Sequence, residues 1–89
     1  METIKLQFPV EHNGGEIASL KMRRPRVRDQ RVADKSADDV GDKEIALFAN
    51  LCEVDPEVIH DLDLADYTNV QEAYKGFLSS TKAPSSEPA

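Results

Sequence analysis

Residues 4–22, IKLQFPVEHNGGEIASLKM, hold two apolar runs on either side of a strong turn signal. Apolar residues occupy every second position from Ile4 to Val10, which is typical of a strand with one buried face. Residues 12–15, HNGG, tolerate the positive φ angles that a tight hairpin turn requires. The apolar positions resume at 17, 20 and 22, and the step from 17 to 20 breaks strict alternation, so we expect a bulge or a late strand start there. The stretch predicts a β-hairpin over residues 3–24.

Two strands form only a marginal sheet on their own, so another layer must cover the apolar face of this hairpin. Pro9 cannot donate a hydrogen bond within a sheet, which places it at an edge or on the outward face. Helices from the rest of the chain, or a second copy of the chain, are expected to cover five side chains: Ile4, Leu6, Phe8, Leu20 and Met22.

A basic segment, LKMRRPRVRDQR, spans residues 20–31, and Pro25 ends the second strand within it. The segment holds six Lys or Arg side chains and one acid, Asp29. Residues 1–31 carry seven Lys or Arg against four Asp or Glu, and residues 32–89 carry four against thirteen. A chain with a net charge of −6 therefore has one basic region. We name its four central arginines the basic junction: Arg23, Arg24, Arg26 and Arg28.

Three interpretations of the basic junction are open. Its arginines could pair with acids of later helices, as surface charges often do. They could dock an acidic or helical protein partner, because arginine is enriched at interface hot spots. Contact with nucleic-acid phosphates is the least favoured, since no aromatic residues interleave with the arginines and the negative net charge repels a polyanion.

Helical patterns follow the basic junction. Residues 27–34 predict a short helix with little apolar content, and residues 35–42, KSADDVGD, predict a polar loop. Asp42 is the expected N-cap of a longer helix. The apolar stripe of that helix falls at i, i+3, i+4 and i+7, namely Ile45, Phe48, Ala49 and Cys52. Leu47 and Leu51 widen this stripe.

Two further helices are indicated by strong start signals. Asp55-Pro56-Glu57 combines a capping residue, a proline suited to the first turn and an acid at the positive end of the helix dipole. Asp63 begins the last helix, and Asp66, three residues later, is expected to complete a variant of the capping box. One face of that helix carries Tyr67, Val70, Ala73, Tyr74 and Phe77.

These elements predict one small α+β domain over residues 1–78, in which the hairpin is followed by three or four short helices at 26–78. Residues 79–89 lack apolar periodicity and contain two prolines, so we expect a disordered tail. No apolar run is long enough to span a membrane, and because METIKLQF lacks a basic region followed by an apolar run, we expect no signal peptide.

No pattern in the sequence indicates catalysis, a cofactor or a metal. His12 and His60 lack a second ligand at metal-binding spacing, and Cys52 has no CxxC companion. Cys52 shares its register with Phe48 and is expected to be a small core residue. A lone cysteine fits a reducing, cytoplasmic location.

Four segments in a fixed order carry a family resemblance. They are the junction RRPRVRD at 23–29, EIALFANL at 44–51, DPEVIHDLDLADY at 55–67 and QEAYKGFL at 71–78. Together they make residues 3–78 resemble the small tail assembly chaperones of Mu-like and related contractile-tailed bacteriophages. The loop KSADDVGD does not align with that pattern.

The resemblance implies a non-enzymatic chaperone of the tape measure protein, a long and largely helical chain that sets tail length. Such a protein keeps the tape measure soluble in the host cytoplasm, assists its assembly with tail tube subunits and is absent from the mature virion. The resemblance also implies a longer, frameshifted form with an added C-terminal domain. Self-association through the same apolar surface stays open.

The leading hypothesis is that the chain binds tape measure segments through the basic junction and through apolar helix faces. The expected contact residues are Arg23, Arg24, Arg26, Arg28, Phe48, Leu51, Tyr67, Tyr74 and Phe77, although some of the apolar ones must belong to the core. The alternative is a small DNA-associated regulator with a helix-turn-helix in its second half. That alternative needs a cationic recognition helix, and this one carries Asp66, Glu72 and only Lys75. An accessory enzyme subunit also stays open.

Overall fold

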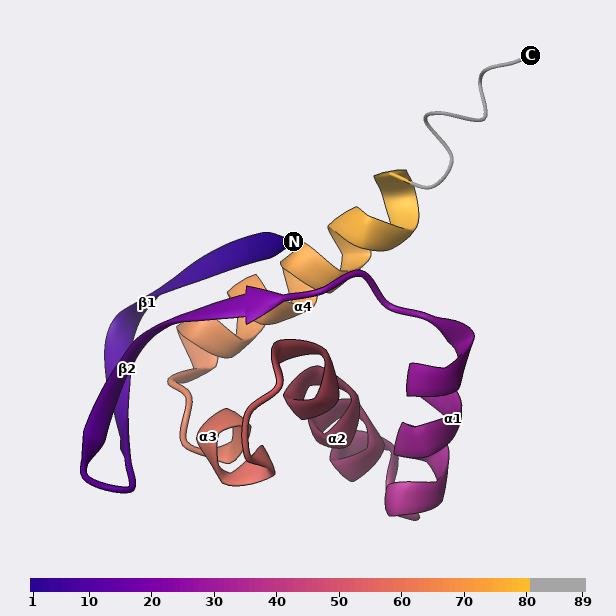
Figure 1. Ribbon diagram of the computed structural model, residues 1–89, viewed down its shortest axis with the longest axis horizontal. Coiled ribbons are helices and arrows are strands. Elements are labelled where there is room, and N and C mark those ends of the chain that lie inside the picture. The colour runs from indigo at the N-terminus through magenta and orange to yellow at the C-terminus, as the bar shows by residue number, and fades with distance from the viewer. Residues whose placement is uncertain (81–89) are drawn as a thin grey trace.

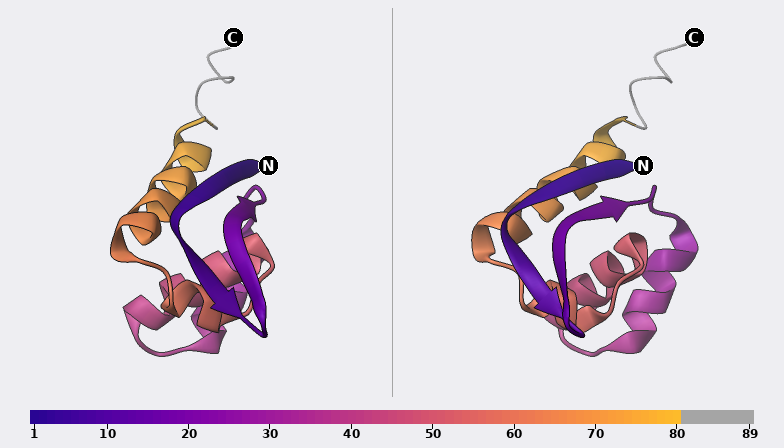
Figure 2. Two further views of the ribbon diagram at one scale, coloured as in Figure 1. Left: turned by 90° about the vertical axis from the view of Figure 1, so that its left-hand side faces the viewer. Right: turned by 60° about the vertical axis from the view of Figure 1, so that its left-hand side comes forward.

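The computed structural model describes residues 1–80 and has the predicted α+β architecture of a hairpin followed by helices (Figure 1). Six elements follow one another, and their order along the chain is β1 (Glu2–His12), β2 (Gly15–Met22), α1 (Val27–Ser36), α2 (Val40–Cys52), α3 (Pro56–His60) and α4 (Leu64–Ser80). Figure 1 shows α2 in the middle, with α1 and α3 on either side of it. The N-terminal half of β1 runs beside α4 (Figure 2).

The hairpin turn forms where the sequence places it. Asn13 and Gly14 have φ angles of 52° and 79°, and His12 pairs with Gly15 across the turn. Two consecutive positive φ angles give the backbone the twist that matches the flanking strands. The predicted β-hairpin is therefore confirmed.

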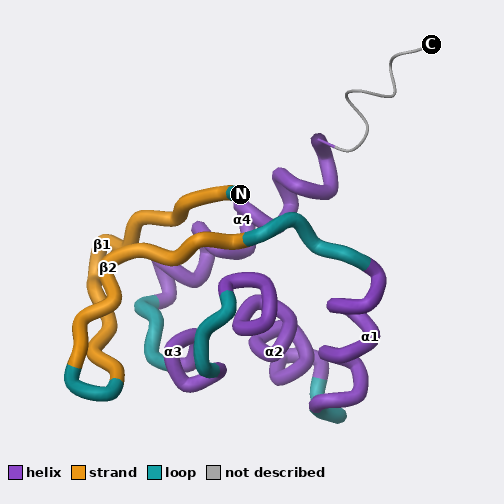
Figure 3. The backbone as a smooth tube through the Cα atoms, in the orientation of Figure 1, coloured by secondary structure: helices purple, strands orange, loops and turns teal. Residues whose placement is uncertain are grey.

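The hairpin has its bulge in β1. The spacing of the apolar residues had predicted a bulge or a late strand start in β2. Lys5 pairs with Ser19 and Val10 pairs with Ile17, so residues 6–9 of β1 lie opposite Ala18 alone. Extra residues in one strand bend it and disrupt the ladder, and the hairpin bends near its middle (Figure 3). Pro9 lies within this unpaired segment, where no ladder hydrogen bond is lost.

The bulge changes which side chains of β1 are covered. The helices bury Ile4, Leu6, Leu20 and Met22 as predicted, but Phe8 is 55% exposed. The expectation that Phe8 is covered was wrong, because the bulge interrupts the strict alternation on which it rested. The large aromatic side chain of Phe8 is therefore exposed on the surface of the hairpin.

The core forms where the hairpin, α2, α3 and α4 meet. Phe48 of α2 is at its centre, and the rings of Tyr67 and Tyr74 on α4 pack edge-on against it at centroid distances of 5.8 and 5.6 Å. Aromatic pairs in this arrangement add to the gain from burial itself. The remaining buried apolar side chains come from every described element and include Leu51, Val58, Ile59 and Val70.

The connection between α1 and α2 is shorter than the predicted polar loop. α1 continues to Ser36 and α2 begins at Val40. Asp39 is the N-cap of α2, and its carboxylate accepts a hydrogen bond of 3.2 Å from the backbone N–H of Asp42. Asp42 was therefore wrongly expected to be the cap, since an earlier aspartate fills that role.

The last two helices begin where the start signals placed them. The Asp55 carboxylate accepts from the N–H of Glu57, and the Asp63 carboxylate accepts from the N–H of Ala65. Asp66 takes no part in a capping box, because its carboxylate is directed to β1 instead. α4 ends at Ser80, two residues into the segment predicted as a tail, and the rest of that tail lies outside the described residues. Within residues 1–80, no helix has the length and apolar character needed to cross a membrane.

Cys52 is buried at the end of α2, as its register predicted. Burial raises the pKa of its thiol to about 11, because the thiolate loses hydration. We expect the folded protein to resist alkylation by iodoacetamide at about pH 8 and to react rapidly once urea unfolds it. Mass spectrometry of both samples checks this, and rapid labelling without denaturant would contradict the buried placement.

Candidate functional site

The basic junction is organised around a buried carboxylate. Arg23 donates two parallel hydrogen bonds to Asp29, of 2.9 Å from Nη1 and 2.8 Å from Nη2. Asp29 also accepts from the backbone N–H of Arg26 and from the amide of Asn50 on α2, each at 2.9 Å. The hydrogen bonds from Arg23 lower the pKa of Asp29 most, and they outweigh the opposing effect of burial. Asp29 therefore joins the end of β2, the start of α1 and the side of α2.

Arg23 is a structural residue as well as a charged one. Its backbone N–H donates to the carbonyl of Leu51 at 3.1 Å. Its guanidinium Nε lies 3.5 Å from a carboxylate oxygen of Glu53, just after α2. Arg23 therefore fits the first interpretation of the basic junction, in which its arginines pair with acids. Its main partner, however, is Asp29 of the basic segment itself, and Glu53 is the second.

The other three arginines of the basic junction form an exposed cationic surface. Arg24, Arg26 and Arg28 line a shallow depression of about 400 Å³ together with Arg23 and Asp29. Within residues 1–80, none of these three side chains lies within ion-pair distance of a carboxylate. Arg24 sits 5.8 Å above the centre of the Phe77 ring, in a cation–π arrangement.

The predicted apolar contact residues divide between core and surface. Phe48 and Leu51 are 1% and 0% exposed, so in this conformation they have no surface to offer a partner. Tyr67 is half-buried, and its hydroxyl donates to Glu44. Burial and this carboxylate both raise the pKa of Tyr67, burial having the larger effect. Tyr74 and Phe77 are also half-buried against the core.

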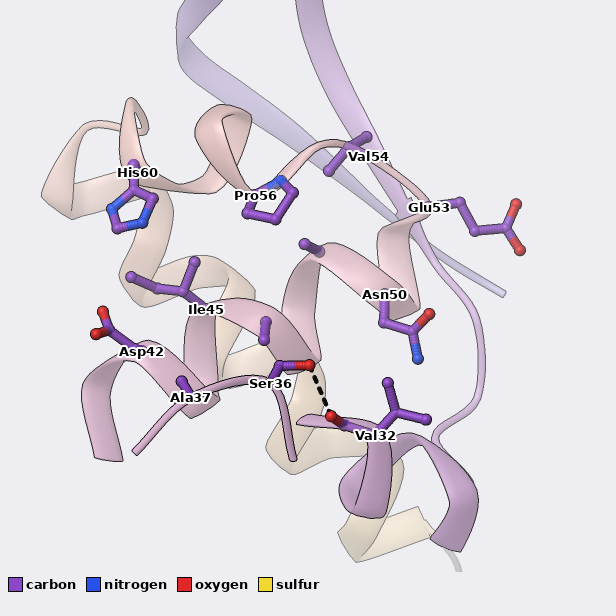
Figure 4. A pocket seen from close by; sticks show the side chains of 12 residues that line it. Val32, Ser36, Ala37, Asp42, Ile45, Asn50, Glu53, Val54, Pro56 and His60 are labelled. Carbon is purple, nitrogen blue, oxygen red and sulfur yellow. Dashed lines mark hydrogen bonds between the residues drawn. The ribbon is translucent and has the colours of Figure 1, made fainter. Parts of the chain in front are cut away.

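A groove that sequence reasoning missed runs along α2 between α1 and α3 (Figure 4). We name it the α2 groove, and its volume is about 600 Å³. Its floor is one face of α2, made by Asp42, Ile45, Ala46, Ala49 and Asn50, and Glu53 extends the floor just beyond the end of the helix. Its sides come from α1, with Val32 and Ser36, and from the α3 region, with Val54, Pro56 and His60. The sequence does hold one sign of this groove. The apolar stripe of α2 is wider than a single buried face requires, so part of it can stay uncovered.

Two polar groups in the α2 groove are already hydrogen-bonded. The Ser36 hydroxyl donates to the carbonyl of Val32 at 2.7 Å, and the Asn50 amide donates to Asp29 at 2.9 Å. The groove therefore offers mainly apolar contact along its length. Figure 4 shows Asp42 and Glu53 near its opposite ends, with Ile45 between them.

No chemistry of an active site is evident in this geometry. Among residues 1–80, no group of three or more His, Cys, Asp or Glu side chains is placed to hold a metal ion. Cys52 is buried and protonated, and His60 lines the α2 groove beside Pro56. The described residues thus form two exposed surfaces of different chemistry, one cationic and one apolar with acidic ends.

Comparison with known proteins identifies the family of the chain. Residues 3–79 match the family described as "Phage tail assembly chaperone proteins, E, or 41 or 14". Comparison with curated proteins and with solved structures found no match. The match runs from the second residue of β1 to the last but one residue of α4. The chain therefore belongs to the phage tail assembly chaperone family.

Proposed function

We propose that the chain binds the tape measure protein of its phage in the host cytoplasm, keeps it soluble and delivers it to the assembling tail tube. The family supports a non-enzymatic role in tail assembly. The observation that carries the finer proposal is the open α2 groove, along which Ile45, Ala46 and Val54 are only partly buried. On this proposal the chain leaves before the virion matures.

A tape measure chain needs such a partner for a physical reason. A long helical protein exposes apolar stripes until the tube encloses it, and exposed stripes of that kind aggregate. A groove that accepts one stripe covers it reversibly. Several copies of this small chain along one client would add avidity, and their net charge of −6 each would keep the loaded complex soluble.

Co-expression tests the proposal. We expect the soluble fraction of the tape measure protein from the same phage to rise severalfold when this chain is produced with it. An unrelated small acidic protein at the same level is the control for charge and expression load. Equal solubility of the tape measure protein in both cultures would contradict the proposal.

The DNA-binding alternative is not favoured by the arrangement of α4. Asp66 is buried against β1, and Lys75 lies 3.8 Å from the Glu72 carboxylate on the same helix. A helix that reads the major groove needs free cationic or amide side chains on one face. In α4 the Asp66 carboxylate is turned to the hairpin, and the exposed Lys75 has Glu72 beside it.

A further inference from the structure

We propose that the α2 groove holds an amphipathic helix of the tape measure protein whose apolar stripe is flanked by Lys and Arg. This inference rests on the proposed function and names the surface and the chemistry of its client. It is carried by the length of the groove floor, by the exposure of its side and by the sign of the charges at its ends.

The length of the floor suits a helix. Positions 42, 45, 46, 49 and 50 recur at the spacing of one helix face and span eight steps of α2, and position 53 follows just after the helix. At a rise of about 1.5 Å per residue, the helical part of the floor is about 12 Å long, or about two helical turns. A partner helix lying along α2 would place apolar side chains at i, i+3, i+4 and i+7 against it.

The groove is apolar and open on the α1 side. Val32 is 53% exposed although it faces the groove, and Ile45, Ala46 and Val54 are only partly buried. Ile45 and His60 also border a second depression of about 320 Å³, beside which Leu64 is largely exposed. The uncovered apolar surface thus continues from α1 across α2 to the start of α4.

The charges around this surface have one sign. Within the described part of the chain, no Lys or Arg lines either depression. Asp42 and Glu53 lie near the two ends of the α2 groove, and Glu44 borders the second depression. Of these three acids, and among residues 1–80, only Glu53 lies within ion-pair distance of a cation, Arg23 at 3.5 Å. Acidic ends on an apolar groove complement a helix with basic flanks and repel one with acidic flanks.

The chain offers a matched pair of variants on α1. Val32→Lys places a long cationic side chain at the open side of the groove, where it obstructs the apolar contact and repels a basic helix. Val27→Lys makes the same change on the same helix at a site that is 79% exposed and borders none of the depressions described above. Because both valines are largely outside the core, neither variant should unfold the protein.

The probes are overlapping peptides that cover the tape measure protein of the same phage, and binding is measured by fluorescence anisotropy. We expect the bound peptides to be cationic with an apolar helical stripe. Val32→Lys should weaken their binding about tenfold, whereas Val27→Lys should leave it within about twofold. Circular dichroism of both variants confirms that they remain folded.

Several results would overturn the inference and leave the proposed function standing. The first is equal binding of the peptides by the two variants. The second is that the bound peptides are acidic or lack an apolar helical stripe. The third is that no peptide binds although the chain still keeps the tape measure protein soluble. Failure of the wild-type chain to solubilise the tape measure protein would instead remove the proposed function and this inference with it.

Discussion

Replacing Asp29 with alanine is expected to lower the free energy of unfolding by about 3 kcal/mol. Asp29 is 2% exposed and accepts four hydrogen bonds, two from Arg23, one from the Arg26 backbone and one from Asn50. Its removal leaves a half-buried guanidinium without its main partner and three elements without their shared contact. Urea unfolding of the purified variant measures the loss.

Asp34→Ala on the same helix is the control. Asp34 is exposed and, within the part of the chain that the structure describes, accepts one long hydrogen bond, 3.5 Å from Gln30, so the change should cost less than about 0.5 kcal/mol. Similar losses for the two variants would show that the Asp29 network contributes no more than a surface acid.

The Asp29 network also predicts a direction of pH dependence. The pKa of Asp29 is lowered in the folded protein, chiefly by the hydrogen bonds from Arg23. Its contribution is therefore fully present above the unfolded value of about 3.9 and is lost as the pH falls through the lower folded value. The stability difference between wild type and Asp29→Ala should shrink below about pH 4.

Replacing Asp66 with alanine is expected to cost about 3 kcal/mol as well, for a different reason. The fully buried Asp66 carboxylate accepts from the backbone N–H groups of Gln7 and Phe8, at 2.9 and 3.0 Å. These donors lie in the bulge of β1, where β2 does not pair with them. Without Asp66 they lose their partner, and α4 loses its polar link to the hairpin.

Asp63→Ala is the matched control for Asp66→Ala, because it removes an exposed cap of the same helix and should cost about 1 kcal/mol. Hydrogen exchange at the amides of Gln7 and Phe8 gives a second measure, and it should speed up in Asp66→Ala but not in Asp63→Ala. Unchanged exchange at those two amides would refute the role assigned to Asp66.

The sequence predicts the elements of this fold well where the signals are local. The turn at residues 12–15, the cap at Asp55 and the proline after it are each read within a few residues, and each is confirmed. The role of Asp66 could not be predicted, because its hydrogen-bond partners in β1 are 58 and 59 residues away along the chain. A carboxylate near the start of a helix looks like a cap until the strand that it holds is known.

The candidate site was harder to predict for a related reason. Phe48 and Ile45 belong to the same apolar pattern of α2, yet one fills the core and the other lines the groove. Only the packing of α1 and α3 decides which side of the helix stays open. The exposure of Phe8 likewise depends on a bulge formed by residues of both strands.

The most direct test of the account follows the backbone amide chemical shifts of the isotopically labelled chain during titration with tape measure peptides. The account predicts that the shifts change along the α2 groove, at Val32, Ile45, Ala46 and Val54, while amides in the Phe48 core keep their folded positions. Changes confined to the basic junction and Phe77, with the groove unaffected, would contradict it.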